Sequence, residues 1–129
     1  MKVFIADDSK IVRDRLATLL SELKDVQIIG YAEDVPESIE AIRELEPDVV
    51  ILDIRMPGGS GINVLQEIKK KGNGPIFIIL TNYPYPAYRK KCMEAGADFF
   101  FCKSTQFDKV AEIIRDLQRR PHACNPPPA

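Results

Sequence analysis

The sequence predicts an α/β fold in which five parallel strands alternate with five helices. Short apolar runs bounded by turn residues alternate with longer segments of helical period, and this pattern occurs five times in the 129 residues. Most of the runs are continuously apolar and rich in β-branched residues, which is typical of strands buried on both faces of a parallel sheet. Right-handed crossovers then give a doubly wound (βα)5 three-layer sandwich with a five-stranded parallel sheet.

Each predicted strand is a short apolar segment. The five are Lys2 to Ala6, Val26 to Ala32, Asp48 to Leu52, Ile76 to Leu80 and Asp98 to Phe101. Clear apolar stripes at helical spacing mark the first and last helices. The helical segments are Ile11 to Leu23, Val35 to Leu45, Gly61 to Lys71, Pro84 to Ala95 and Phe107 to Leu117.

Helix-end signals support these boundaries. Asp34 stands three residues before Glu37, a spacing that predicts an N-cap. Gly72 and Gly96 follow their helices, where a left-handed terminator is favoured.

Length and composition predict one domain with a polar tail. With 129 residues and 45% hydrophobic content, the chain can bury a single core. We expect the domain to cover residues 1–119 and the proline-rich residues 120–129 to form a disordered tail. The net charge of -1 and the dispersed Lys and Arg residues predict no direct nucleic-acid binding. Two acids interrupt the N-terminal apolar run early, so we expect no signal peptide, no membrane contact and a cytoplasmic protein.

The cysteine and histidine contents favour neither a disulfide framework nor a zinc site. Cys92, Cys102 and Cys124 are an odd number without metal-type spacing, and we expect reduced thiols. Cys102 precedes Lys103, so a redox-sensing thiol is an alternative to a small residue that ends a strand. The single histidine, His122, lies in the predicted tail, which argues against a histidine metal site.

Five polar or charged residues lie at or just after the carboxyl ends of the predicted strands. They are Asp7 and Asp8 after the first strand, Asp53 after the third, Thr81 after the fourth and Lys103 after the fifth. Ligands of open parallel sheets bind beyond these strand ends, so we expect the five side chains to converge. Asp7 and Asp8 alone would indicate a helix N-cap, and Asp53 alone an ordinary strand-end acid. Their coincidence with Thr81 and Lys103 favours a functional site.

The charge balance of this site predicts a divalent cation. Three carboxylates and one ammonium leave about -2, and repulsion between like charges in a semi-buried site is on the order of a few kcal/mol. Oxygen ligands with room for water and phosphate suit Mg²⁺, with Mn²⁺ as an alternative.

Two other phosphate-related sites are disfavoured by the same residues. In an FMN site of the flavodoxin type, Asp7 and Asp8 would repel the phosphate unless a metal intervened. A phosphatase of the haloacid dehalogenase type needs a second acid two residues after its nucleophile, and here that position is Arg55.

Several short motifs occur in order along the chain. They are Asp7-Asp8, Asp53-Ile54-Arg55-Met56-Pro57 followed by Gly61, Leu80-Thr81, Gly96-Ala97-Asp98, and Phe100 three residues before Lys103. Each is weak alone, but their combination is specific. On these motifs the chain resembles the receiver domain of two-component response regulators, close to the chemotaxis-regulator type, from Lys2 to about Leu117. The resemblance implies the flavodoxin-like strand order 2-1-3-4-5.

The resemblance also implies the chemistry of the site. Asp53 would be phosphorylated, accepting the phosphoryl group from a phosphohistidine of a sensor histidine kinase or a phosphotransfer protein. Asp8 would bind Mg²⁺ directly and Asp7 would help through water. The Asp53 carboxylate and the main-chain carbonyl of Arg55 would complete the protein ligands.

Three further residues receive roles from the resemblance. Lys103 would pair with Asp53 and then with a phosphoryl oxygen. Thr81 would donate its hydroxyl to the phosphoryl group, and Phe100 would turn into the space that Thr81 vacates. Phe100 can also be read as plain core, since it lies in an apolar run.

The predicted output is a change of shape rather than turnover of a substrate, so we do not expect an enzyme in the usual sense. The segments around 84–95, 98–101 and 105–117 would bind a downstream protein or form a homodimer. Alternatives are an interaction module that works without phosphorylation, a small phosphatase that turns over a foreign substrate, and a receiver separated from an effector domain.

Four residues near the site depart from or individualise the family pattern. Ser104 stands where many receivers have a proline with a cis bond, and Asn82 stands where a very small residue is commoner. Arg55 and Tyr83 would flank the pocket mouth, at positions that the resemblance links to the lifetime of the phosphoryl group. The aromatic run from Tyr83 to Tyr88 would be either a partner-binding surface or a rigid helix entry.

Overall fold

The computed structural model describes residues 1–69 and 74–119, and it has the predicted α/β architecture. A five-stranded parallel sheet has the order β2-β1-β3-β6-β7. Its strands are β1 (Lys2–Ala6), β2 (Gln27–Ala32), β3 (Val49–Leu52), β6 (Ile76–Thr81) and β7 (Phe99–Cys102). In sequence order this is the predicted 2-1-3-4-5 arrangement, because β6 and β7 are the fourth and fifth strands of this sheet.

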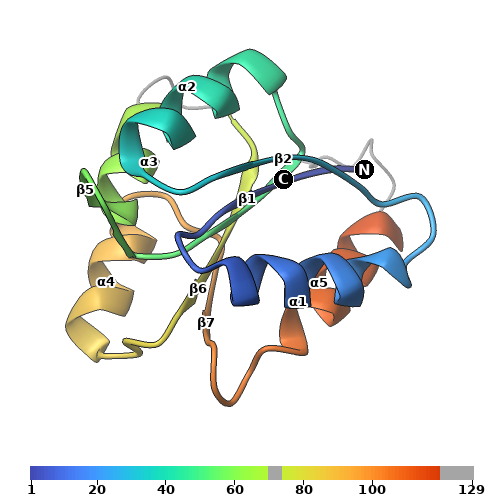
Figure 1. The fold of residues 1–129 in the computed structure, drawn as a ribbon. Helices are drawn as coiled ribbons and strands as arrows, with labels where there is room; N and C mark the ends of the chain where they lie inside the picture. Colours follow the sequence, from blue (N-terminus) through green and yellow to red (C-terminus); the bar gives the residue numbers. More distant parts are fainter. Residues whose placement is uncertain (70–73, 120–129) are drawn as a thin grey trace, which may run out of the picture.

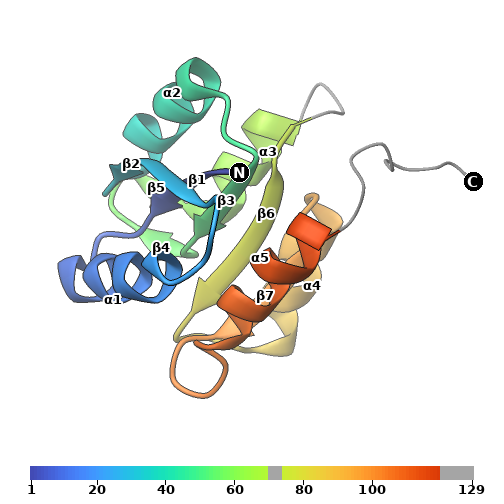
Figure 2. The ribbon, with the colours of Figure 1, turned by 90° about the vertical axis from the view of Figure 1, so that its right-hand side faces the viewer.

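Five helices cover the two faces of the sheet. They are α1 (Lys10–Ser21), α2 (Val35–Leu45), α3 (Gly61–Lys69), α4 (Pro86–Glu94) and α5 (Lys109–Arg119). Figure 1 shows α1 and α5 on one face and α2, α3 and α4 on the other. Figure 2, turned by a quarter, shows α5 in front and the fainter α4 behind it.

Alternation along the strands builds a separate core on each face. On β1, Phe4 and Ala6 belong to the cluster beneath α2, α3 and α4, whereas Val3 and Ile5 belong to the cluster beneath α1 and α5. All four side chains are fully buried. This explains why the strands read as continuous apolar runs, since both faces are covered.

The helix ends follow local chemistry. The Ser9 hydroxyl accepts a hydrogen bond from the Val12 amide, so Ser9 is the N-cap of α1 rather than either acid before it. Asp34 caps α2 as predicted, accepting from the Glu37 amide at 2.8 Å. Gly96 follows α4 with φ +113, a conformation that L side chains rarely adopt.

Some details differ from the sequence-based prediction. A two-stranded antiparallel hairpin, β4 (Arg55–Met56) and β5 (Gly59–Ser60), lies between β3 and α3 and was not predicted. The last helix begins at Lys109 rather than near Phe107, and the fourth at Pro86 rather than Pro84.

The predictions for Gly72 and for the tail 120–129 lie outside the described residues. Within 1–69 and 74–119, no helix has the length and apolar character needed to cross a membrane.

Candidate functional site

The five predicted site residues meet at the carboxyl edge of the sheet. Strand register explains part of this convergence, because Ala6 on β1 pairs with Leu52 on β3 and the chain continues from them into Asp7 and Asp53. Thr81 pairs with Cys102 in the same way, which places Lys103 next to the fourth strand of the sheet. Asp7, Asp53, Thr81 and Lys103 are buried, and Asp8 is exposed.

Lys103 connects the two buried acids. Its Nζ lies 2.8 Å from Asp7 Oδ2 and 3.0 Å from Asp53 Oδ2. The pairing of Lys103 with Asp53 was predicted, whereas its pairing with Asp7 was not. Since the three side chains are no more than 9% exposed, these ion pairs are screened little by solvent.

Burial shifts the ionisation of this cluster. Burial raises the pKa of Asp53 above its ordinary value; the charge of Lys103 opposes this shift and the charge of Asp7 adds to it. Burial alone would lower the pKa of Lys103. Its hydrogen bond to Asp7 and the charges of both acids outweigh burial, so the pKa is raised. The site therefore keeps a charged lysine and holds Asp53 in an environment that disfavours its negative charge.

The three acids form a site that could hold a metal ion. One carboxylate oxygen from each of Asp7, Asp8 and Asp53 lies within 4.8 Å of the others. Their donor set is all oxygen and one lysine neutralises only part of its charge, which fits a hard divalent cation such as Mg²⁺. The Arg55 carbonyl as a further ligand stays a prediction.

Gly61 is required by close backbone packing beside Asp53. A Cβ atom at position 61 would lie 2.2 Å from the Asp53 carbonyl oxygen, far inside any permitted contact. The Gly61 amide donates to the Ile54 carbonyl at 2.6 Å, and the Ile54 amide donates to Asp53 Oδ1 at 2.8 Å. Any larger residue would displace the loop that carries the acid.

The predicted switch residues Thr81 and Phe100 lie on the neighbouring strands β6 and β7. The Thr81 hydroxyl is fully buried and accepts from the Tyr83 amide at 3.1 Å. The Lys103 amide donates to the Thr81 carbonyl at 2.8 Å, which ties the two strand ends together. Phe100 is buried in the core on the α4 side, with the Arg89 guanidinium 5.7 Å from its ring centre. Its movement on phosphorylation stays a prediction.

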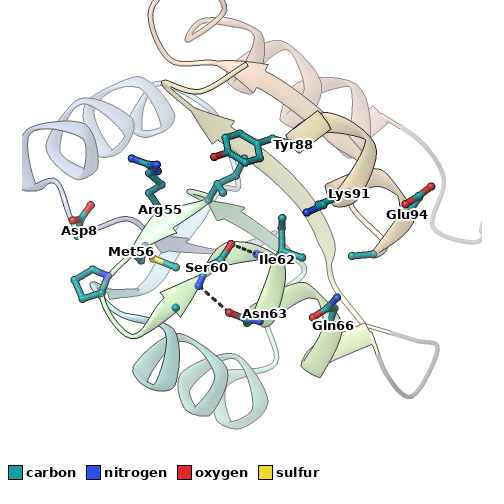
Figure 3. Close-up of a pocket in the computed structure, with 14 residues that line it drawn as sticks. Asp8, Arg55, Met56, Ser60, Ile62, Asn63, Gln66, Tyr88, Lys91 and Glu94 are labelled. Atoms are coloured by element: carbon teal, nitrogen blue, oxygen red, sulfur yellow. Dashed lines mark hydrogen bonds between the residues drawn. The ribbon is translucent and has the colours of Figure 1, made fainter. Parts of the chain in front are cut away.

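Arg55, predicted to flank the mouth of the site, lines the same groove as Asp8. Its guanidinium carbon is 4.4 Å from the centre of the Tyr83 ring. Hydrogen bonds to the Tyr83 and Tyr88 hydroxyls raise the pKa of Arg55. A groove of about 1090 Å³ runs from Asp8 and Arg55 along α3 and α4 to Glu94 (Figure 3). Of the five site residues, Asp8 lines this groove.

Tyr83, predicted to flank the mouth together with Arg55, also contacts the neighbouring aromatic residue. The ring centres of Tyr83 and Tyr85 are 6.3 Å apart, and those of Tyr85 and Tyr88 are 5.7 Å apart. Both interpretations of this run, a partner-binding surface and a rigid helix entry, stay predictions.

The remaining predictions near the site concern Ser104 and the cysteines. The peptide bond between Lys103 and Ser104 is trans. Cys92 and Cys102 are free thiols, as expected. Burial raises the pKa of Cys92 to about 11, whereas hydrogen bonds from Ser104 and Thr105 lower the pKa of Cys102 to about 7. Cys124 lies outside the described residues.

One residue that sequence reasoning missed supports the site from α1. Arg13 Nη1 donates to the Asp7 carbonyl at 2.8 Å and lies 3.8 Å from Glu33 Oε1. A basic residue on a predicted helix is ordinary, and nothing in its spacing from Asp7 signals this contact.

Known proteins share the sequence pattern and the fold of this chain. A sequence model described as the response regulator receiver domain matches residues 3–115. The uncharacterized transcriptional regulatory protein YvfU of Bacillus subtilis (strain 168) is 40% identical over 115 residues, which are 89% of this chain and 58% of that protein. The chain thus spans little more than half the length of this curated relative.

Solved structures show the same fold. The response regulator domain of Thermotoga maritima CheB matches with a TM-score of 0.81 and 29% identity, covering 98% of both chains. The isolated REC domain of RcsB from Salmonella enterica serovar Typhimurium, in the presence of the phosphomimetic BeF3⁻, gives a TM-score of 0.84 and 28% identity. That match covers 92% of this chain and 88% of the other. The chain belongs to the response regulator receiver domains of two-component systems.

Proposed function

We propose that Asp53 accepts a phosphoryl group in a Mg²⁺-dependent reaction and that the domain signals by changing shape. One observation carries the proposal most strongly. A buried carboxylate contacts a buried lysine at 3.0 Å, and two further acids lie close enough to share a cation with it. A cluster of like charges is costly to bury. Phosphoryl transfer would be a functional reason to keep these charges together.

Each site residue would have a separate role around the phosphoryl group. An Asp53 carboxylate oxygen forms the new bond to phosphorus as the bond from phosphorus to the donor's imidazole nitrogen breaks. Asp7, Asp8 and Asp53 would hold Mg²⁺, which supplies positive charge for the phosphoryl oxygens. Lys103 would pair with one of those oxygens, and the Thr81 hydroxyl would donate to another. Phosphoryl transfer depends mainly on such positioning and charge neutralisation.

The phosphorylated state would alter the last two strands of the sheet. Phosphorylation adds roughly one negative charge at Asp53, together with new acceptor oxygens. Thr81 ends β6, and its carbonyl is bonded to the Lys103 amide, so a pull on either residue acts on both strand ends. Phe100 would then repack beneath α4. The α4-β7-α5 face is our candidate for binding a downstream protein or forming a homodimer.

The partners and the setting follow from the same proposal. The phosphoryl donor would be a sensor histidine kinase or a histidine phosphotransfer protein in the cytoplasm. The domain would be both substrate and catalyst of its own modification, and not an enzyme acting on foreign molecules. YvfU is named as a transcriptional regulatory protein, but this chain covers 58% of it, so a role in transcription is not carried over.

Intact-mass spectrometry tests the proposal. The protein is incubated with acetyl phosphate, with and without Mg²⁺, and we expect an adduct of about +80 Da that requires Mg²⁺. Asp53→Asn should abolish the adduct. Asp48→Asn, at an exposed acid of the opposite sheet edge, should leave it intact. No adduct in the wild type, or an adduct that survives Asp53→Asn, would overturn the assignment.

A further inference from the structure

Arg13 fixes the peptide group that joins the two acids after β1. Its Nη1 donates to the Asp7 carbonyl oxygen at 2.8 Å. That carbonyl belongs to the planar peptide between Asp7 and Asp8. A hydrogen bond to this oxygen therefore restrains rotation of the peptide plane, which affects the direction of Asp8 as well as Asp7.

The other contacts of Asp7 hold its amide and its side chain, but not the peptide between Asp7 and Asp8. The Asp7 amide donates to the Ala32 carbonyl at 3.0 Å, and its carboxylate accepts from the Ser9 amide at 2.9 Å. Its other carboxylate oxygen contacts Lys103. Asp7 is thus held at its amide and at its side chain, and Arg13 supplies the contact at its carbonyl.

Asp8 depends on the backbone far more than Asp7 does. It is exposed, and among the described residues its carboxylate has no hydrogen-bond or ion-pair partner. The carboxylate nevertheless lies within the shared 4.8 Å limit of the other two acids. Because no side-chain contact holds it there, the orientation of the Asp7–Asp8 peptide has the largest influence on its position.

The charge of Arg13 alone would act in the opposite direction. A guanidinium near three carboxylates repels an incoming cation and competes for the same negative charge. Glu33, 3.8 Å from Arg13 Nη1, offsets part of that charge. The Arg13 side chain is only 15% exposed, so its hydrogen bond to the peptide is sheltered from water. Positioning and repulsion therefore predict opposite effects of removing Arg13.

We propose that Arg13 is a positioning residue for the cation site, which it supports by fixing the peptide between Asp7 and Asp8. The proposal rests on the Mg²⁺ binding of the proposed function. In this proposal, a residue of α1 stabilises the loop that joins β1 to α1. Removal of a group that orients metal ligands commonly weakens metal affinity by about 10–100-fold.

An NMR titration of each folded variant with Mg²⁺ alone provides the test. Backbone amide shifts yield the Mg²⁺ dissociation constant of the folded molecules, so a loss of stability does not imitate a loss of affinity. We expect Arg13→Met to weaken binding by about 10-fold. Arg13→Lys, which keeps a cationic donor, should restore part of the affinity. If Arg13→Met folds too poorly to titrate, Arg13→Leu, which also lacks a hydrogen-bond donor, provides the same comparison.

Arg15→Met is the matched control. Arg15 lies on the same helix, and its guanidinium carbon is 4.0 Å from the Phe107 ring centre. Its replacement should change Mg²⁺ affinity less than threefold. A change below threefold for Arg13→Met, or tighter binding, would overturn the positioning role, and a larger weakening supports it. If the wild type itself binds no Mg²⁺, the proposed function fails instead, so the two failures are distinct.

Discussion

The two edges of the parallel sheet use aspartate in different ways. At the amino edge, Asp48 and Asp98 each precede a strand and accept a backbone hydrogen bond from a neighbouring strand. Asp48 Oδ2 accepts from the Lys2 amide at 2.7 Å, and Asp98 Oδ2 accepts from the Phe77 amide at 2.9 Å. Both acids are exposed. They stabilise strand ends while water solvates their charge.

At the carboxyl edge, Asp7 and Asp53 are buried and share the ammonium of Lys103. Asp7 and Asp53 are 3% and 6% exposed, and both contact the ammonium of Lys103. Burying charges costs more than solvating them, and one ammonium cannot neutralise three nearby carboxylates. The difference teaches that the acids of the amino edge stabilise strand ends, whereas the carboxyl edge keeps a costly arrangement that fits the proposed binding and chemistry.

Removing the Lys103 ammonium that Asp7 and Asp53 share should give the largest loss of stability. We expect Lys103→Met to lower the free energy of unfolding by about 3–5 kcal/mol at neutral pH, because two buried carboxylates lose their common partner. The pKa of Lys103 is raised in the folded state, so its contribution is present at neutral pH and is lost only as pH rises through that raised value. Urea unfolding measures the change.

Two comparisons sharpen this prediction. Lowering the pH should restore part of the lost stability of Lys103→Met, because Asp53, whose pKa burial raises, can then take up a proton. Lys69→Met is the control from the other edge, where Lys69 lies 3.9 Å from the exposed Asp98, and it should cost less than about 1 kcal/mol. Equal losses in the two variants would remove the distinction between the edges.

A methyl group at Gly61 should be the next most damaging change. It would meet the Asp53 carbonyl, which is backbone and cannot rotate away, so we expect Gly61→Ala to cost roughly 3 kcal/mol in urea unfolding. Gly30→Ala is the control. Its Cβ would lie 3.1 Å from Leu45 and Phe4 side-chain atoms, which can shift, so it should cost about 1 kcal/mol. The reverse order would show that the Asp53 loop yields easily.

Much of this contrast is visible in the sequence, for reasons that also explain what is not. Continuous apolar runs identify the buried strands, and the rule that ligands bind beyond parallel strand ends brings Asp53 and Lys103 together. The hairpin from Arg55 to Ser60 could not be predicted from the sequence, because two-residue strands are too short to show a periodic pattern. The sequence also cannot tell which of Asp7 and Asp8 faces inward, because that depends on how the chain leaves β1.

Long-range support for the site is the least predictable part. Arg13 reaches the Asp7 carbonyl from the first turns of α1, and such a contact depends on helix position rather than on a motif. The choice of Ser9 as the N-cap of α1 could not be predicted from the sequence either, although this contact is local. Three polar residues precede this helix, and only the fold selects the one that caps it.

The smallest predicted effect is the change in the free energy of unfolding when aspartate is replaced by asparagine. It should have opposite signs at the two edges of the sheet. Burial raises the folded-state pKa of Asp53, so stability is greatest when it is protonated and falls as pH rises through that value. Asp53→Asn should therefore raise the free energy of unfolding by about 1 kcal/mol at neutral pH, and this gain should shrink in acid. Lys103 keeps Asp7 as its partner in the variant.

The same substitution at the amino edge should destabilise. Asp98 is exposed and accepts from the Phe77 amide, so Asp98→Asn exchanges a charge-assisted acceptor for a neutral one and should cost about 1 kcal/mol. Urea unfolding of both variants without Mg²⁺ gives the comparison in one experiment. If both substitutions lower stability, the Asp53 charge is not a cost in the folded protein, and the contrast between the edges fails for the residue on which the proposed function depends.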